Sequence, residues 1–377
     1  MARIPITPAV LEWAIEQAGL DPAGFAEAAR FDVDTVLEWL SADAQPTKTQ
    51  LNKIATVLKR PTAFFLLPDP PRDVAVPAAF RRPAGRSQHK ATKTEIEAVA
   101  RARRIQRIAK WTAERVGDSR WVENPIPEAS TGQAPQQAAT AAASWLDWSI
   151  AEQRAAPSPS AVVKLMRARL EERGVIALQL SIGKDGCRGF SLYDRLKPVV
   201  TVNTHYNPQA RLFTYIHEVG HLMRRTDAMC VDYSQTAAER WCERFAASFL
   251  LPRQPLRERV DERFGRDAVV SELDEVRKLA NDFNVSLAAT AIRLDDLGWG
   301  RDLFLRVPKT ADDKQRGGPG NTDTTRGAAR TRELGEGYFS LLLAGQDRGV
   351  LGRQDVLRYL DVSERQLQGT GIGPLER

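Results

Sequence analysis

The chain has 377 residues, 42% of them hydrophobic, and a formal net charge of +6. This length and composition predict two or three domains with real cores. No run approaches 18 consecutive apolar residues and no signal pattern opens the sequence, which excludes a transmembrane protein. Three cysteines without a CxxC pair argue against a disulfide framework. We therefore expect a cytoplasmic protein with no membrane partner.

Residues 1–70 are predicted to form a series of short helices. Start signals stand at Thr7 and Asp21, each followed by proline, and apolar side chains recur at helical spacing. The order of these helices, including Trp39, resembles an Xre-type helix-turn-helix domain, and that resemblance implies DNA as a partner. The segment, however, holds six Lys or Arg against nine Asp or Glu, and phosphate would repel such a surface. Sequence-specific DNA binding and protein docking therefore both stay open.

A basic stretch follows this first domain. Residues 71–93 are predicted to be a stiff proline-rich linker, and residues 94–157 a basic helical connector. Between residues 81 and 115, eleven Lys or Arg face three glutamates. Four closely spaced arginines are the candidates for phosphate contacts: Arg101, Arg103, Arg104 and Arg107. A solvated helix face, or a face paired with the acidic first domain, explains the same pattern equally well.

Residues 158–306 are predicted to form the main domain. One helix and then three β-rich runs come first: 161–172, followed by 175–182, 188–193 and 198–204. A small sheet of this kind offers an edge to which an extended peptide could add as a strand. His205, just beyond the third run, is a candidate to hydrogen-bond the oxyanion of a transition state.

His217, Glu218 and His221 form an HExxH pattern on a predicted helix. Positions i and i+4 of a helix share a face, so both imidazoles can bind one Zn²⁺ ion. Zn²⁺ lowers the pKa of a water ligand to roughly 7, and Glu218 would act as general base and then as general acid. The chain has only four histidines, so the pattern is a specific signal for a metallohydrolase.

A catalytic zinc site needs a third protein ligand. Asp227 holds the third-ligand position of the metzincin pattern, but Arg224 replaces that pattern's glycine, which makes Asp227 a minor option. The stronger candidate is Glu239 on a second amphipathic helix over 236–252. Glu243, one turn further on, is a candidate to accept a hydrogen bond from a ligand histidine. A solvated charged face also explains the two glutamates.

These segments resemble the ImmA/IrrE family of metallopeptidases. The resemblance rests on four runs: 189–192, 198–203, 211–223 and 239–252. It implies an α+β fold, in which a mainly helical, zincin-like domain with a small sheet follows an all-α helix-turn-helix domain. It also implies roles for four residues: acid/base catalysis by Glu218 and zinc binding by His217, His221 and Glu239. Cys242 and Glu243 replace the family's usual Ala-Asn pair, which bears on the surroundings of the ligands.

Two segments complete the chain. Residues 307–330 are predicted to be a disordered linker, and residues 331–377 a helical tail to which the sequence assigns no function. The features together predict an intracellular zinc endopeptidase, and the family resemblance implies a regulatory role with a repressor-like protein as substrate. The alternative is a transcriptional regulator or antitoxin-like protein that binds DNA, a toxin or another regulator, with the peptidase fold as a sensor or binding domain.

Overall fold

The computed structural model of the chain describes residues 3–18, 20–58, 60–70, 92–130, 132–184, 186–225, 237–308 and 325–374. Helices and one small sheet make up these residues, which confirms the predicted α+β class. The chain divides into two compact units: residues 1–76 with 89–100, and residues 77–88 with 101–377. The predicted linker lies almost entirely outside the described residues.

The first unit is built of short helices. They are α1 (Pro8–Gln17), α2 (Pro22–Ala29), α3 (Val33–Leu40), α4 (Lys48–Val57) and the 3₁₀-helix η1 (Thr62–Leu66). Asp21 accepts a hydrogen bond from a first-turn amide of α2, and Thr47 forms a capping box at the start of α4. Phe25, Trp39 and Phe65 are buried in a core of their own. The structure therefore confirms the prediction that this segment consists of short helices.

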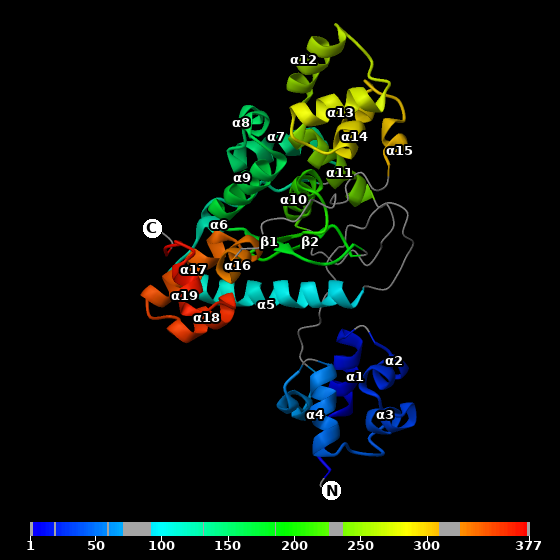
Figure 1. Cartoon of the computed structure of the whole chain (residues 1–377), viewed down its shortest axis with the longest axis vertical. Helices are drawn as coiled ribbons and strands as arrows, with labels where there is room; N and C mark the ends of the chain where they lie inside the picture. The colour runs from blue at the N-terminus through cyan, green and yellow to red at the C-terminus, as the bar shows by residue number, and fades with distance from the viewer. Residues whose placement is uncertain are drawn as a thin grey trace. The chain divides into compact units, whose positions relative to one another are not determined.

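A three-stranded sheet supports the helices of the second unit. Its order is β1 (Ile176–Leu180), β3 (Val199–Asn203) and β2 (Gly189–Leu192), with β3 parallel to β1 and antiparallel to β2. Each strand lies within one of the predicted β-rich runs. Helix α10 (Pro208–Met223) lies on one face of the sheet, and the later turns of α5 (Lys93–Val116) lie on the other (Figure 1).

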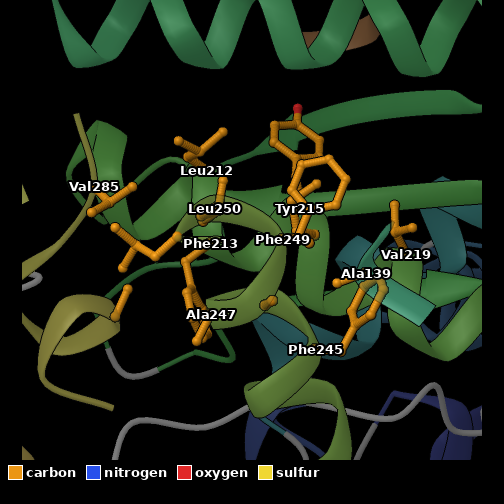
Figure 2. Packing of buried hydrophobic residues seen from close by; sticks show 14 of the residues in the cluster. Ala139, Leu212, Phe213, Tyr215, Val219, Phe245, Ala247, Phe249, Leu250 and Val285 are labelled. Atoms are coloured by element: carbon orange, nitrogen blue, oxygen red, sulfur yellow. The ribbon is translucent and has the colours of Figure 1, made fainter. Parts of the chain in front are cut away.

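Helices packed around α10 form the main hydrophobic core. Helix α10 contacts α9 (Pro159–Glu172) and α11 (Ala237–Leu250), and α11 also contacts α7 (Pro135–Leu146) and α14 (Leu287–Asp296). Figure 2 shows large side chains of α10 and α11 meeting between these helices: Leu212, Phe213, Tyr215, Phe245 and Phe249. This packing fixes α10 and α11 against each other.

The residues predicted as a separate connector contribute to the same core. Trp121 and Trp145 are both buried and meet edge to face, with ring centroids 5.9 Å apart. The predicted boundary between residues 157 and 158 is therefore not a boundary of the fold, because one core continues across it. The remaining helices here are α6 (Arg120–Glu123), α8 (Ile150–Ala155), α12 (Arg253–Phe264), α13 (Leu273–Asp282) and α15 (Leu303–Arg306).

The C-terminal tail is helical, and it begins earlier than predicted. It consists of α16 (Arg326–Leu334), α17 (Glu336–Asp347), α18 (Arg353–Leu360) and α19 (Glu364–Gln368). Thr325 caps α16 by accepting a hydrogen bond from a first-turn amide. The prediction of disorder over residues 307–330 is therefore wrong for its last residues, while residues 309–324 lie outside those described.

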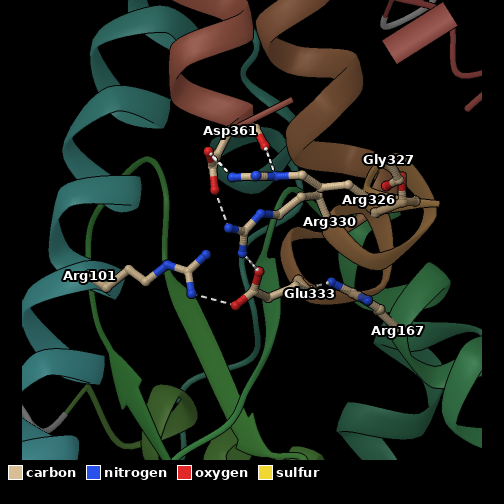
Figure 3. Close-up of polar contacts among 8 residues, drawn as sticks. Arg101, Arg167, Arg326, Gly327, Arg330, Glu333 and Asp361 are labelled. Carbon is tan, nitrogen blue, oxygen red and sulfur yellow. Dashed lines mark hydrogen bonds and ion pairs between the residues drawn. The ribbon is translucent and has the colours of Figure 1, made fainter. Parts of the chain in front are cut away.

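Charged side chains attach this tail to the rest of the second unit. Glu171 of α9 accepts hydrogen bonds from Arg167 (3.0 Å) and from the Gly337 amide (2.8 Å). Arg101 of α5 pairs with Glu333 of α16 (Figure 3). The tail is thus an integral part of this unit. None of the helices in the described ranges is long and apolar enough to cross a membrane.

Candidate metal centre

Helix α10 is buried along most of its length. Asn207 caps it, and Pro208 occupies its first turn, where a missing amide hydrogen costs nothing. Its apolar residues pack into the core, so the HExxH turn is enclosed as well. His217 exposes 0% of its surface, Glu218 1% and His221 4%. Buried polar groups of this kind need partners, which a neighbouring helix provides.

Helix α11 brings a carboxylate to the two imidazoles. Glu239 places Oε2 3.1 Å from His217 Nε2 and Oε1 3.3 Å from His221 Nε2, and the two Nε2 atoms lie 3.2 Å apart. A tetrahedral zinc ion with bonds of about 2.0–2.2 Å holds its ligand atoms roughly 3.3–3.6 Å apart. The donor atoms are therefore spaced nearly as zinc requires, and two nitrogens with one carboxylate form a ligand set of catalytic zinc sites.

The electrostatics of the cluster also fit a cation. Burial alone would raise the pKa of Glu239, but hydrogen bonds from His217 and His221 lower it well below its usual range. Burial alone would lower the pKa of His221, yet Cys242, Glu239 and Glu218 together raise it. A divalent cation bound among these side chains would compete with a proton for His221.

Cys242 occupies the place beside His221 that was predicted for Glu243. A hydrogen bond with Cys242 contributes to the raised pKa of His221. Burial raises the pKa of the Cys242 thiol, and the neighbouring His221 opposes that shift. A Cβ at Gly220 would lie 3.2 Å from Cys242 Sγ and 3.0 Å from Phe245 Cδ1, so glycine allows α11 to approach α10.

Glu243 lies on another side of α11. It lines a surface pocket of about 320 Å³ together with Arg240, Arg244 and residues of α14 and α15. Among the described residues it makes no hydrogen bond to His217 or His221. The reason is the helical rotation between adjacent positions, which turns Cys242 toward α10 and Glu243 away from it.

One other candidate stands apart from the cluster. His205 follows β3, and its ring meets Tyr206 edge to face at a centroid distance of 5.6 Å. It does not belong to the group of converging donor atoms, and its role toward an oxyanion stays a prediction. Asp227, the minor option for the third ligand, lies outside the described residues.

The basic helix α5 serves partly as a packing element. Arg101 pairs with Glu333, and Lys110 pairs with Asp194 at 2.8 Å. The side-chain amide of Gln106 donates hydrogen bonds to the backbone carbonyl oxygens of Leu192 (3.1 Å) and Lys197 (2.9 Å). Phosphate contacts by the basic side chains of this helix, Arg103, Arg104 and Arg107 included, remain a prediction.

One contact of the Glu218 carboxylate was not predicted from the sequence. The Ser191 hydroxyl on β2 donates a hydrogen bond to Glu218 Oε2 with a donor–acceptor distance of 2.9 Å, and both side chains are buried. Only the position of Ser191 within the run 189–192, which carries part of the family resemblance, pointed toward this residue. Nothing in the spacing of the two residues predicted that they would meet.

Residues 170–295 match the family model of peptidase M78, described as the IrrE N-terminal-like domain. The match runs from the end of α9 into α14 and includes the sheet, α10 and α11, and so all three converging side chains. It supports a metallopeptidase role for this part of the chain. No curated protein and no solved structure matches the chain.

Proposed function

We propose that this chain is an intracellular zinc endopeptidase with a regulatory role, and that its substrate is a repressor-like protein. The observation that carries the proposal is the convergence of His217, His221 and Glu239 beside the buried Glu218. The family match over residues 170–295 supports the same activity.

The chemistry follows from these side chains. Zinc held by the two imidazoles and the carboxylate would supply Lewis acidity, which polarises a peptide carbonyl and eases the deprotonation of water. Glu218 moves the proton: its carboxylate takes one from the attacking water and gives it to the departing amine nitrogen. Burial of Glu218 limits its contact with other water, so the proton stays available for the amine.

The first unit is proposed to select the substrate. Residues 1–70 carry nine acidic against six basic side chains, and this excess favours a basic protein surface over phosphate. A repressor presents such a basic surface, because it binds the phosphates of DNA. Docking of this kind would restrict an intracellular peptidase to one class of protein.

A second candidate function is that of a transcriptional regulator or antitoxin-like protein. The observation that favours it is the pair of short helices α2 and α3, joined by a turn in which Arg30 has a φ of 49°. In this case the first unit would bind DNA, and the metal centre would sense a signal or bind a toxin or regulator. Tight operator binding that survives Glu218→Gln, without any cleaved partner, would favour this function.

Cleavage of candidate repressors by the wild type and by Glu218→Gln tests the proposed peptidase. Glutamine keeps the size of the side chain but cannot accept a proton, so we expect normal zinc binding and a loss of cleavage by at least about a hundredfold. Glu243→Gln is the matched control, because Glu243 lies on α11 away from the histidines. Cleavage by Glu218→Gln at the rate of the wild type would exclude the proposed role of the Glu218 carboxylate.

A further inference from the structure

The Glu218 carboxylate has a defined partner from another element. Ser191 Oγ lies 2.9 Å from Glu218 Oε2, and each residue exposes 1% of its surface. The last torsion of a glutamate side chain is broad, so the carboxylate plane is not set by its own stereochemistry. A buried donor on one oxygen selects one orientation of that plane.

The strand and the helix are matched in register at this contact. Residues i and i+2 of a strand share a face and lie about 6.8 Å apart, while residues i and i+4 of a helix lie about 6 Å apart along its axis. Gly189 meets Thr214, since a Cβ at Gly189 would lie 2.4 Å from Thr214 Cγ2. Two strand residues later Ser191 meets Glu218, one helical turn beyond Thr214. The close approach at Gly189 therefore brings Ser191 to the carboxylate.

We infer that Ser191 is a positioning residue, whose hydroxyl holds the Glu218 carboxylate in the orientation needed to take a proton from water and pass it to the leaving amine. This inference rests on the proposed function of Glu218. The hydroxyl acts as donor because an ionised carboxylate can only accept. Its contribution belongs to the rate of the chemical step and not to zinc binding or substrate affinity, because the Ser191 hydroxyl is hydrogen-bonded to Glu218 and, among the described residues, to neither His217 nor His221.

A purely structural role for Ser191 makes a different prediction. A buried hydroxyl that only satisfies its own hydrogen bond would affect stability when removed and leave turnover of the folded enzyme unchanged. The sheet offers a matched control in Thr201 of β3, whose hydroxyl is fully buried and makes no hydrogen bond to any described residue. Thr201→Val removes a hydroxyl from the same sheet without removing a contact to Glu218.

The test compares full-length wild type, Ser191→Ala, Ser191→Thr and Thr201→Val, each loaded with Zn²⁺. Zinc content, thermal unfolding, and kcat and KM on a library of internally quenched peptides are measured. We expect Ser191→Ala to lower kcat about ten- to hundredfold, with zinc content and KM unchanged. Ser191→Thr should restore most of the rate, and Thr201→Val should match the wild type. A kcat of Ser191→Ala within twofold of the wild type would overturn the inference.

A crystal structure of Ser191→Ala tests the positioning role without a measurement of turnover. This test also does not depend on whether Ser191→Thr folds. We expect the Glu218 carboxylate to rotate or to occupy more than one orientation in this variant. An unchanged single orientation would overturn the positioning role. If the wild type cleaves no peptide and no repressor, the proposed peptidase fails, and the orientation of Glu218 still decides the role of Ser191.

Discussion

Lys197 and Asp118 form an ion pair in the interior of the second unit. Their side chains expose 1% and 5% of their surfaces. Burial alone would raise the pKa of Asp118, but the hydrogen bond from Arg120 and the charge of Lys197 hold it far below its usual range. Burial lowers the pKa of Lys197, and Asp118 opposes that shift. The pair joins the end of α5 to the start of β3.

Asp118→Asn should destabilise the protein at neutral pH, because it leaves the buried ammonium of Lys197 without its carboxylate. Loss of one partner of a buried ion pair costs about 3–5 kcal/mol in free energy of unfolding. The folded-state pKa of Asp118 is depressed, so its contribution is present above the unfolded value of about 4 and is lost as the pH falls below it. Urea unfolding at a series of pH values should show the gap between wild type and variant narrowing below about pH 4.

An exposed ion pair serves as the control for this prediction. Asp274 pairs with Arg277, and their side chains expose 82% and 57%. Asp274→Asn should cost less than about 1 kcal/mol at any pH. Similar losses in free energy of unfolding for Asp118→Asn and Asp274→Asn would show that burial does not strengthen the ion pair between Lys197 and Asp118.

The sequence could predict those residues whose positions follow from a helical pattern. His217 and His221 share a face by their spacing alone, and Glu239 followed as the best acidic side chain of the next amphipathic helix. The neighbours of these residues could not be predicted in the same way. Cys242 reaches His221 only because of the rotation of α11, and Ser191 reaches Glu218 only because β2 packs on α10.

At the scale of elements, the close contact between β2 and α10 depends on Gly189. A Cβ at this position would lie 2.4 Å from Thr214 Cγ2 and 2.5 Å from the backbone oxygen of Thr201. Gly189→Ala should therefore move the strand away from the helix and cost about 1–3 kcal/mol of stability. We also expect lower cleavage activity at saturating zinc, because Ser191 moves with the strand.

Thermal unfolding and peptide cleavage of this variant check the prediction. Gly373→Ala is the control, since no atom of the described residues would lie within 4 Å of the added Cβ, and it should behave as the wild type. A Gly189→Ala protein with wild-type stability and turnover would show that the contact relaxes at no cost.

Alternating and helical patterns of apolar residues predicted the strands and helices better than they predicted how these elements are arranged. The three β-rich runs each contain one strand, but the order of the strands and the antiparallel direction of β2 depend on pairing between distant segments. The start of helix α16 was missed because Gly, Thr and charged residues lead into it, and its stability comes from contacts to β1, α17 and α19. Tertiary packing therefore overrides the local composition there.

The whole molecule consists of two units with separate cores. If the acidic first unit docks the substrate, deletion of residues 1–70 should lower cleavage of a repressor at least about tenfold, the effect of roughly 1.4 kcal/mol of lost binding. Zinc content and hydrolysis of short peptides should stay unchanged, because the second unit holds all three converging side chains. Unchanged cleavage of the repressor would exclude docking by this unit.

The central claim is that His217, His221 and Glu239 hold a zinc ion, and zinc stoichiometry and affinity test it most directly. Wild type, Glu239→Gln and Glu243→Gln are stripped of metal, reconstituted with Zn²⁺ and titrated with a competing chelator. We predict about one zinc per chain in the wild type and in Glu243→Gln, and at least a tenfold weaker affinity in Glu239→Gln, which loses a charged ligand. A wild type that takes up no zinc, or a Glu239→Gln variant that binds it equally tightly, would contradict the proposed centre.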